Sequence, residues 1–421
     1  MTQFLRLSLC APIFLACLNT AAPLYAADLG GDCCADLEER IAELEATTAL
    51  KGNRKVALTV SGHVNSAVMF WDDGRESNAF VVGNKNDQSN FSFTGDAKIT
   101  DSVRAGYVVT IRLKDTLSDE VDQYQDDGDA GFVVWESYWF VESEKIGRLS
   151  MGQVSRVSDT APENDLSETG SAGYTGVQDM GGGFFLRRKD GTLSDVALGD
   201  LYSHLNGDTA NVVRYDTPVI AGFVLSASWG EDDMWDVGAQ YEGDFNSIKI
   251  SASIAYSQDT DENGLDGSGG DPSKVLVGSI AILHEPSGFN VLISAGEQDF
   301  DDRGLATANF IYTKLGWIAK LSALGPTAFY GEFGRFNDFL SNADAFGAGI
   351  SSVAGDTITG SQAEVWGFGV VQHIEAAAME IYIGYRHHEL DLDLANGANT
   401  PVATPVIEDF QTIVVGSKIS F

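Results

Sequence analysis

The sequence predicts an all-β fold, a 16-stranded antiparallel transmembrane β-barrel preceded by a short N-terminal coiled-coil helix. The last twelve residues alternate between apolar and polar side chains, which places Ile413, Val415, Ile419 and Phe421 on one face of a strand. From residue 56 onward, short turns alternate with long polar loops, as they do in outer-membrane barrels. The 421 residues include 46 glycines and 9 prolines, a composition typical of many strands joined by turns.

Residues 1–26 are expected to be a cleaved export signal. Arg6 supplies the positive charge, residues 7–18 the apolar stretch, and Ala26 a small residue before the cleavage site. Lipoprotein processing at Cys17 is the alternative. Beyond the signal, no apolar run approaches the ~20 residues that a membrane helix needs, so any membrane span is expected to consist of strands.

Residues 27–54 are expected to form a periplasmic oligomerisation segment whose helix covers residues 36–50. Its apolar positions follow coiled-coil spacing, and they are Leu37, Ile41 and Leu44. About two heptads are too short to be stable alone, which favours association with identical copies. A single amphipathic helix lying on its own chain is the alternative.

Two adjacent cysteines, Cys33 and Cys34, remain after the signal is removed. Two cysteines cannot form a disulfide framework for so long a chain, and neighbouring residues bridge each other poorly. Bridges between chains and exposed free thiols are both compatible with the sequence.

Residues 55–421 are expected to form the barrel. Its clearest strand covers residues 103–113, with apolar side chains on one face and Arg104 and Arg112 on the other. Aromatic residues near predicted strand ends are expected to form interface girdles, and they are Trp71, Trp135, Trp229, Trp235, Trp317 and Tyr385. A soluble β-solenoid or sandwich is the alternative, although a solenoid would show a repeat of fixed period, and the sequence has none.

A long loop, about 155–183, follows the fifth predicted strand. A loop of this length is expected to be functional. If it folds into the lumen, its acids form one wall of a constriction, and they are Asp159, Glu163, Asp165, Glu168 and Asp179. Arg104 and Arg112 are candidates for the opposite wall, although eight residues of strand separate them by ~26 Å. Arginines simply solvated in a wide lumen are the alternative.

The net charge of −35 argues against a nucleic-acid partner and suits a surface or channel that attracts cations. The sequence contains no nucleophile, phosphate-loop or zinc-site motif, so neither an enzyme nor a cofactor is predicted. Asp259, Asp261 and Asn263 match the first half of a calcium loop, but Gly270 stands where the loop needs Glu, which makes them a weak calcium candidate only.

Several short segments resemble the trimeric porins of the alphaproteobacterial family. They are Cys33-Cys34-Ala35-Asp36-Leu37-Glu38-Glu39-Arg40-Ile41-Ala42-Glu43-Leu44-Glu45, Gly52-Asn53-Arg54-Lys55-Val56, Arg214-Tyr215-Asp216-Thr217-Pro218, Gly222-Phe223, Ser228-Trp229-Gly230-Glu231-Asp232-Asp233 and the terminal Phe421. The resemblance covers nearly all of the chain beyond the signal. It implies a 16-stranded barrel, a homotrimer, and an inward-folded loop after the fifth strand.

The resemblance also implies passive diffusion of small hydrophilic solutes and ions through the bacterial outer membrane, among lipid and lipopolysaccharide. Phe421 would be part of the signal that the barrel assembly machinery recognises. Together with the acidic composition, this favours a general-diffusion channel that prefers cations. A substrate-specific channel for sugars or dicarboxylates is one alternative, and a structural surface-loop protein or adhesin on a closed barrel is another.

Overall fold

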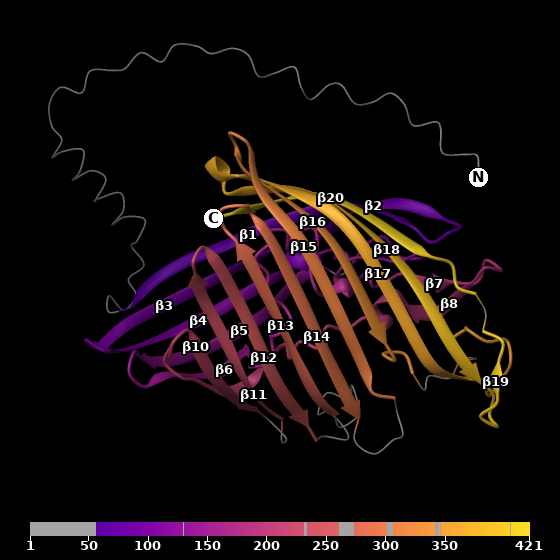
Figure 1. Ribbon diagram of the computed structural model, residues 1–421, viewed down its shortest axis with the longest axis horizontal. Coiled ribbons are helices and arrows are strands. Elements are labelled where there is room, and N and C mark those ends of the chain that lie inside the picture. The colour runs from indigo at the N-terminus through magenta and orange to yellow at the C-terminus, as the bar shows by residue number, and fades with distance from the viewer. Residues whose placement is uncertain are drawn as a thin grey trace, which may run out of the picture. The chain divides into compact units, whose positions relative to one another are not determined.

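The structure, a computed structural model, describes residues 56–128, 130–230, 234–260, 273–300, 306–341, 345, 347–404 and 406–421. The expected export signal and the expected helix with Leu37, Ile41 and Leu44 lie outside the described residues. The part of the chain that the structure describes contains strands and four short 3-10 turns (Figure 1). None of its helical turns is long and apolar enough to cross a membrane.

Within the described residues, 16 antiparallel staves close into a barrel, which confirms the predicted fold class. In chain order the staves are β1 (Ala57–Asp72), β2 with β3 (Ser77–Gly83 and Asn90–Thr100), β4 (Val103–Lys114), β5 (Gly131–Ser143), β6 (Gly147–Ser155), β9 (Thr209–Asp216), β10 (Phe223–Gly230), β11 (Trp235–Phe245), β12 (Ile248–Asp259), β13 (Ser273–His284), β14 (Phe289–Phe300), β15 (Ala308–Ser322), β16 (Gly325–Asn337), β17 (Thr357–Ile374), β18 (Met379–Ala395) and β20 (Phe410–Ser420).

β2 and β3 form one stave because both pair with β1, β2 along its second half and β3 along its first half. A short 3-10 turn, η1 (Lys85–Asp87), separates them. β19 (Pro401–Val402) extends the sheet beside β18. The remaining strands, β7 (Phe185–Arg187) and β8 (Leu193–Ala197), pair only with each other.

The first and last staves close the barrel. β1 and β20 pair in antiparallel register from His63–Ser420 to Asp72–Gln411. The seam ends where Phe421 exchanges two backbone hydrogen bonds with Gly62, at N···O distances of 2.9 and 3.1 Å. Closure removes the unpaired backbone edges that a lipid bilayer cannot satisfy.

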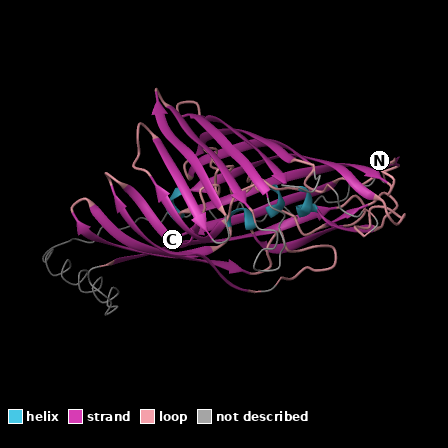
Figure 2. Cartoon of the chain, turned by 90° about the horizontal axis from the view of Figure 1, so that it is seen from below, coloured by secondary structure: helices cyan, strands magenta, loops and turns pink. Residues whose placement is uncertain are grey.

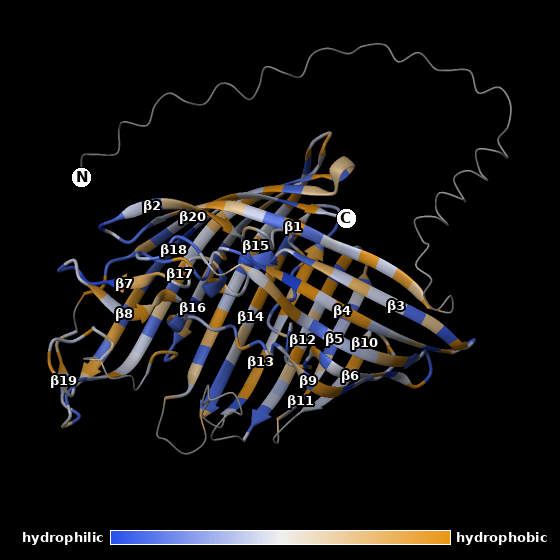
Figure 3. Cartoon of the chain, turned by 180° about the vertical axis from the view of Figure 1, so that it is seen from behind, coloured by the Kyte–Doolittle hydropathy of each residue, from blue (hydrophilic) through white to orange (hydrophobic). Residues whose placement is uncertain are grey.

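Along the staves, hydrophobic and hydrophilic residues alternate (Figure 3). In β20, Ile413 and Val415 are about 40% exposed on the outer face, whereas Thr412 on the inner face is buried. The predicted alternation of the terminal strand therefore separates the outer face from the lumen.

The barrel has two unlike ends. Seven short turns at residues 101–102, 144–146, 217–222, 246–247, 285–288, 323–324 and 375–378 lie at what we call the short-turn end. The connections 115–130, 156–208, 338–356 and 396–409 leave the staves at the opposite, long-loop end.

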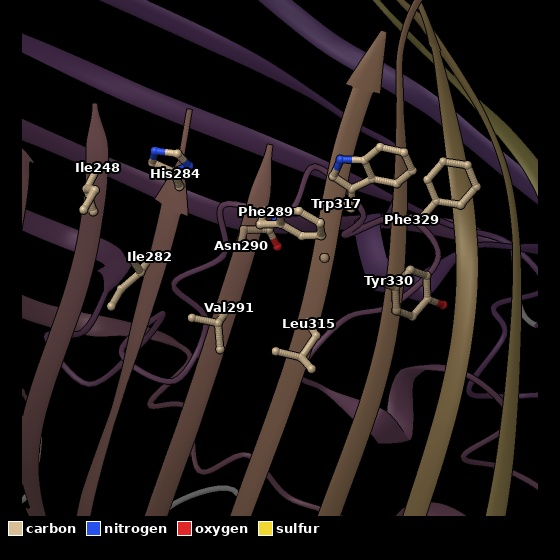
Figure 4. A pocket seen from close by; sticks show the side chains of 11 residues that line it. Ile248, Ile282, His284, Phe289, Asn290, Val291, Leu315, Trp317, Phe329 and Tyr330 are labelled. Atoms are coloured by element: carbon tan, nitrogen blue, oxygen red, sulfur yellow. The ribbon is translucent and has the colours of Figure 1, made fainter. Parts of the chain in front are cut away.

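An aromatic row lies on the outer wall near the short-turn end. Phe289, Trp317 and Phe329 stack across three adjacent staves, with ring centroids 6.1 and 5.7 Å apart. The Trp317 indole donates to the Ser287 carbonyl at 3.1 Å. Figure 4 shows this row beside a hollow over Gly316, which has no side chain. The row is the aromatic arrangement that barrels place at a membrane interface.

Two of the expected girdle aromatics instead face inward. Trp71 is only 6% exposed, and its ring packs 4.8 Å from that of Phe184 inside the barrel. Trp135 lies in the lumen beneath the guanidinium of Arg112. Position near a strand end does not determine which face a residue occupies, so the expectation was wrong for these two residues.

Part of the lumen is filled by an apolar core. The connection between β6 and β9 runs over residues 156–208, beyond the expected loop end at 183, and it contains η2 (Val177–Asp179), β7, β8 and η3 (Leu198–Leu201). Figure 2 shows these short turns between the barrel walls. The apolar side chains of this connection pack against those of β1, β2 and β12–β20. The core includes Met69, Val82, Val177, Met180, Phe184, Leu198, Leu201, Phe310, Tyr312, Phe336, Tyr382 and Phe410.

We call the part of the lumen that this apolar core fills the packed side. The wall of β3–β6 does not take part in the core and forms the open side, where the site described next lies.

Candidate functional site

The connection 156–208, which we call the inner segment, follows the inside of the barrel wall. Asn164 donates to the Ser279 hydroxyl on β13 at 2.8 Å. Farther along, Ser171 donates to a Glu380 carboxylate oxygen on β18 at 2.6 Å. These partners lie about 100 and 200 residues farther along the chain, so staves from the C-terminal half of the sequence hold the inner segment in place.

Lys314 of β15 forms the first of two buried anchors for the inner segment. Its side chain is fully buried, and its ammonium donates to Asp165 at 2.7 Å, the Gly173 carbonyl at 2.5 Å and the Thr169 hydroxyl at 3.3 Å. These three acceptors satisfy all three ammonium protons. A charged group can remain buried in this way only when it is paired and hydrogen-bonded.

Arg386 of β18 forms the second anchor. Its guanidinium donates to the Tyr174 carbonyl at 2.6 Å and to the Val177 carbonyl at 3.3 Å. Two further bonds, of 2.8 and 3.1 Å, join it to Glu332 of β16. The Tyr312 hydroxyl also donates to Glu332, at 2.5 Å. The inner segment is therefore attached to two wall staves, β15 and β18, through buried charges, and Glu332 of β16 holds the second of them in place.

Between the inner segment and the open side lies a polar cavity of about 610 Å³. Its carboxylates are Asp87, Glu120, Glu136, Asp159, Glu163, Asp179 and Asp208, and its basic side chains are Lys85, Arg112, Lys114 and His204. The acids of the inner segment face the cations of η1 and β4 across this space. The inner segment therefore supplies an acidic wall. The opposite wall, which we call the basic wall after Lys85, Arg112 and Lys114, also carries Asp87, Glu120 and Glu136.

Two acids of the inner segment hold their protons more tightly than usual. Burial raises the pKa of Asp159 to about 6, although the Ser155 hydroxyl donates to it at 2.5 Å. Burial raises the pKa of Asp179 to about 7. Removal from water disfavours the charged form of a carboxylate, so both groups change charge near neutral pH.

A third acid, Glu163, is held in the charged form. Burial alone would raise its pKa, but hydrogen bonding from His204, whose Nε2 lies 2.9 Å from Glu163 Oε1, brings the pKa below its usual value. The other ring nitrogen of His204 lies 3.1 Å from the Gln178 amide nitrogen. The Tyr174 ring packs edge-on against the imidazole. His204 carried no sequence signal, because it lies 41 residues from the acid that it contacts.

The basic wall is centred on Arg112. Its guanidinium carbon lies 3.3 Å from the centroid of the Trp135 ring, a cation–π contact between β4 and β5. Lys85 in η1 lines the same cavity and forms an ion pair of 3.1 Å with Asp119. Stacking on the indole fixes Arg112 so that it faces the acids of the inner segment.

Of the residues expected at the constriction, some line the polar cavity and others lie outside it. Asp159, Glu163 and Asp179 line the cavity, as does Arg112. Asp165 instead pairs with the buried ammonium of Lys314 and lies outside the cavity lining. The remaining two also lie outside the cavity lining: Glu168 is 3.7 Å from His373, and Arg104 pairs with Glu142 at 3.0 Å near the short-turn end.

The weak calcium candidate gains no support. Asp259 lies at the end of β12, and Asp261 and Asn263 are outside the described residues. Within the described part of the chain, no group of three or more His, Cys, Asp or Glu side chains could hold a metal ion.

Comparison with known proteins identifies the family. The profile of the Gram-negative porins matches residues 15–400. The chain belongs to the Gram-negative porin family. A comparison with curated proteins found no match. Family and fold place this porin in the outer membrane and indicate a channel rather than an enzyme.

Solved structures share the fold of this porin at low sequence identity. The anion-selective porin from Comamonas acidovorans superposes with a TM-score of 0.55 at 15% identity, over 87% of this chain and 100% of its own. OmpT of Vibrio cholerae gives 0.54 at 12% identity, over 89% and 100%. OmpF of Salmonella typhi, in complex with daunomycin, gives 0.51 at 12% identity, over 86% and 97%. These likenesses support the fold alone.

Proposed function

We propose that this porin forms a passive, water-filled diffusion channel for small hydrophilic solutes and ions, with a preference for cations. The observation that supports the preference is the charge of the cavity, whose lining holds seven carboxylates against three lysine and arginine side chains among the described residues. Rings of fixed charge select ions of the opposite sign. The net charge of −35 also concentrates cations near the channel mouths. Transport down a gradient requires no cofactor.

Reconstitution into planar bilayers tests this proposal. The purified porin should give ohmic conductance steps, and the reversal potential in a KCl gradient should have the sign of cation preference. Absence of ohmic steps would contradict the channel, and a reversal potential of anion sign would contradict the preference. Saturable block by a single solute would favour the substrate-specific alternative.

We further propose that three copies assemble through residues 27–54, as in the alphaproteobacterial trimers that the sequence resembles. A trimer form is described for OmpT of Vibrio cholerae, which supports a trimer in this fold. Deleting residues 36–50 should weaken the trimer and leave the strand content unchanged, as measured by sedimentation in detergent and circular dichroism. A deletion variant whose trimer keeps its resistance to heat and detergent would show that the barrel walls alone hold the copies together.

The terminal residue is proposed to act in membrane insertion. Phe421 ends the β1–β20 seam, and its side chain is 66% exposed, so recognition by the barrel assembly machinery would not disrupt packing. Removing Phe421 should lower the amount inserted among lipid and lipopolysaccharide, without changing the conductance of the molecules that do insert. Normal insertion of the truncated chain would contradict this role.

A further inference from the structure

The inner segment begins against a buried carboxylate of the barrel wall. Asp236, the second residue of β11, is 1% exposed and lies outside the lining of the polar cavity. Within the described residues, its Oδ2 accepts from the Ser158 N–H at 2.9 Å, the Ser158 hydroxyl at 2.6 Å and Arg156 Nε at 3.3 Å. The hydroxyl of Ser228 on β10 donates to its Oδ1. Asp236 therefore holds the first residues of the inner segment against the wall.

The neighbouring backbone leaves room for this contact. Ser158 is fully buried, and a Cβ at Gly207 would collide with its hydroxyl oxygen. A Cβ at Gly238 on β11 would lie only 2.8 Å from a methyl carbon of Val157. The close approach of residues 157–158 to the wall therefore depends on glycine at both positions.

Asp159 follows directly and lines the polar cavity. The next residue, Thr160, has a left-handed φ of 61°, which is strained for a β-branched side chain. Such a conformation persists only where the surroundings fix the backbone on both sides. Beyond it, the Ala161 carbonyl accepts from the Ser279 hydroxyl on β13 at 2.6 Å. Asp159 thus lies between two points at which the wall holds the chain.

We propose that Asp236 is a positioning residue for ion selectivity, because by holding Ser158 it keeps the adjacent carboxylate of Asp159 withdrawn from water at the edge of the polar cavity. The inference rests on the proposed function, since Asp159 acts on ions only if the cavity conducts. Burial raises the pKa of Asp159 to about 6. Without Asp236 the chain around Asp159 gains water, and this pKa should fall toward about 3.9, the value of an exposed aspartate.

Other titratable and charged groups share the cavity with Asp159. They include Arg112 of β4, Glu136 of β5, and Glu163, Tyr174, His204 and Asp208 of the inner segment. Beyond burial, the negative charges of Glu163 and Asp208 also raise the pKa of Asp159. All of these groups remain when Asp236 is replaced, so the replacement changes the setting of Asp159 without removing a charge from the cavity lining.

Reversal potentials of Asp236→Ala in a KCl gradient test this role. At pH 5 the carboxyl of Asp159 is mostly protonated in the native porin and should be charged in the variant. Cation-to-anion permeability should therefore rise about three- to fivefold at pH 5, the worth of one charge near the ion path, and change less than about twofold at pH 8. An unchanged or lower cation preference at pH 5 would overturn the inference, because removing a carboxylate that acted through its own charge would lower it.

Further variants separate position from charge. Asp236→Asn keeps an oxygen acceptor for Ser158, so its cation preference at pH 5 should stay native. Asp244→Ala removes the same charge from an exposed position on the same stave, and it is the matched control with an unchanged preference. In the background of Asp159→Asn, Asp236→Ala should have no effect at pH 5. A rise that persists in that background would overturn the link to Asp159.

Hydrogen exchange tests the contact without relying on conductance. In the purified porin in detergent, peptides covering residues 156–160 should exchange about tenfold faster in Asp236→Ala, because the Ser158 N–H loses its buried acceptor. Ser158→Ala, which removes only the hydroxyl donor, should show a smaller increase and serves if Asp236→Ala does not fold. Native exchange in these variants would overturn the inference whatever the conductance. Faster exchange in a porin without ohmic steps would contradict the proposed channel alone.

Discussion

The staves on the packed side and on the open side of the lumen share the same alternating pattern, but their inward side chains are buried on the packed side and solvated on the open side. On the packed side, inward residues such as Phe310, Phe336 and Phe410 meet the apolar side chains of the inner segment. On the open side, Arg112 and Trp135 face an aqueous cavity. Alternation makes a side chain inward-facing, but the inner segment decides whether that side chain is buried or solvated.

Charged residues differ between the two sides in the same way. Lys314 and Arg386 on the packed side are buried and hydrogen-bonded to the inner segment, so their charges are neutralised locally. The acids of the open side face solvent-filled space, where they can act on passing ions. Charges on the packed side therefore determine the position of the inner segment, and charges on the open side are expected to determine selectivity.

The largest effect is expected from breaking an anchor on the packed side. Lys314→Met leaves the half-buried Asp165 without its cation and breaks the bonds to Gly173 and Thr169, which should cost about 3 kcal/mol of unfolding free energy. Denaturant unfolding in detergent, followed by tryptophan fluorescence, measures this loss. Single-channel records should also show more than one conductance level, because the inner segment is no longer fixed.

Lys249→Met is the matched control for this anchor. Lys249 pairs with Glu285 at the surface, where water screens the charges and an ion pair contributes little to stability. Equal losses of unfolding free energy in Lys314→Met and Lys249→Met would show that the buried ion pair stabilises the fold no more than a surface pair does.

Neutralising the acidic wall should change selectivity and leave stability nearly unchanged. In the double variant Asp159→Asn, Glu163→Gln, the cation-to-anion permeability ratio should fall about fivefold per charge, since a charge ~4 Å from an ion in water contributes about 1 kcal/mol. Reversal potentials measure the ratio. Glu285→Gln at the short-turn end is the control, and an unchanged ratio in the double variant would contradict the assignment of the acidic wall.

Selectivity should also depend on pH. Asp159 and Asp179, with pKa values of about 6 and 7, are both protonated at pH 5 and both charged at pH 8, so cation preference should rise over this interval. Because unfolded Asp loses its proton near pH 3.9, these raised pKa values make the folded state less stable as the pH rises through them. Reversal potentials at pH 5 and 8 test the prediction, and a flat profile would contradict it.

The smallest effect is expected from the basic wall. Arg112→Gln removes one cation from the cavity and should raise cation preference about twofold, because mobile ions screen a single distant charge. Arg104→Gln removes the same charge outside the cavity lining, and its permeability ratio should stay unchanged. Equal responses would show that position within the lumen does not matter.

Much of the barrel could be predicted from the sequence. The alternation in β4 and β20 depends on neighbouring residues only, and it fixed the strands and their outward faces. The two short segments β7 and β8 were harder, because their pattern is too brief to distinguish a stave from a hairpin inside the lumen. The inner segment was therefore expected to end at 183, whereas it continues to 208.

The lining of the candidate site could be predicted only in part. The sequence identified the acidic loop and Arg112, but it could not distinguish Asp159 from Asp165, six residues away. That distinction depends on Lys314, which lies 149 residues beyond Asp165 and reaches it only after the barrel closes. His204 beside Glu163 was missed for the same reason.

By itself, then, the sequence determined the alternating staves, the closed barrel and an acidic channel, because side-chain periodicity and net charge are local or additive properties. The tertiary structure alone decided which half of the lumen is filled, which acids are anchors and which face the solute path. Those outcomes depend on contacts between distant residues, where burial and pairing decide whether a charge is neutralised or left to act on an ion.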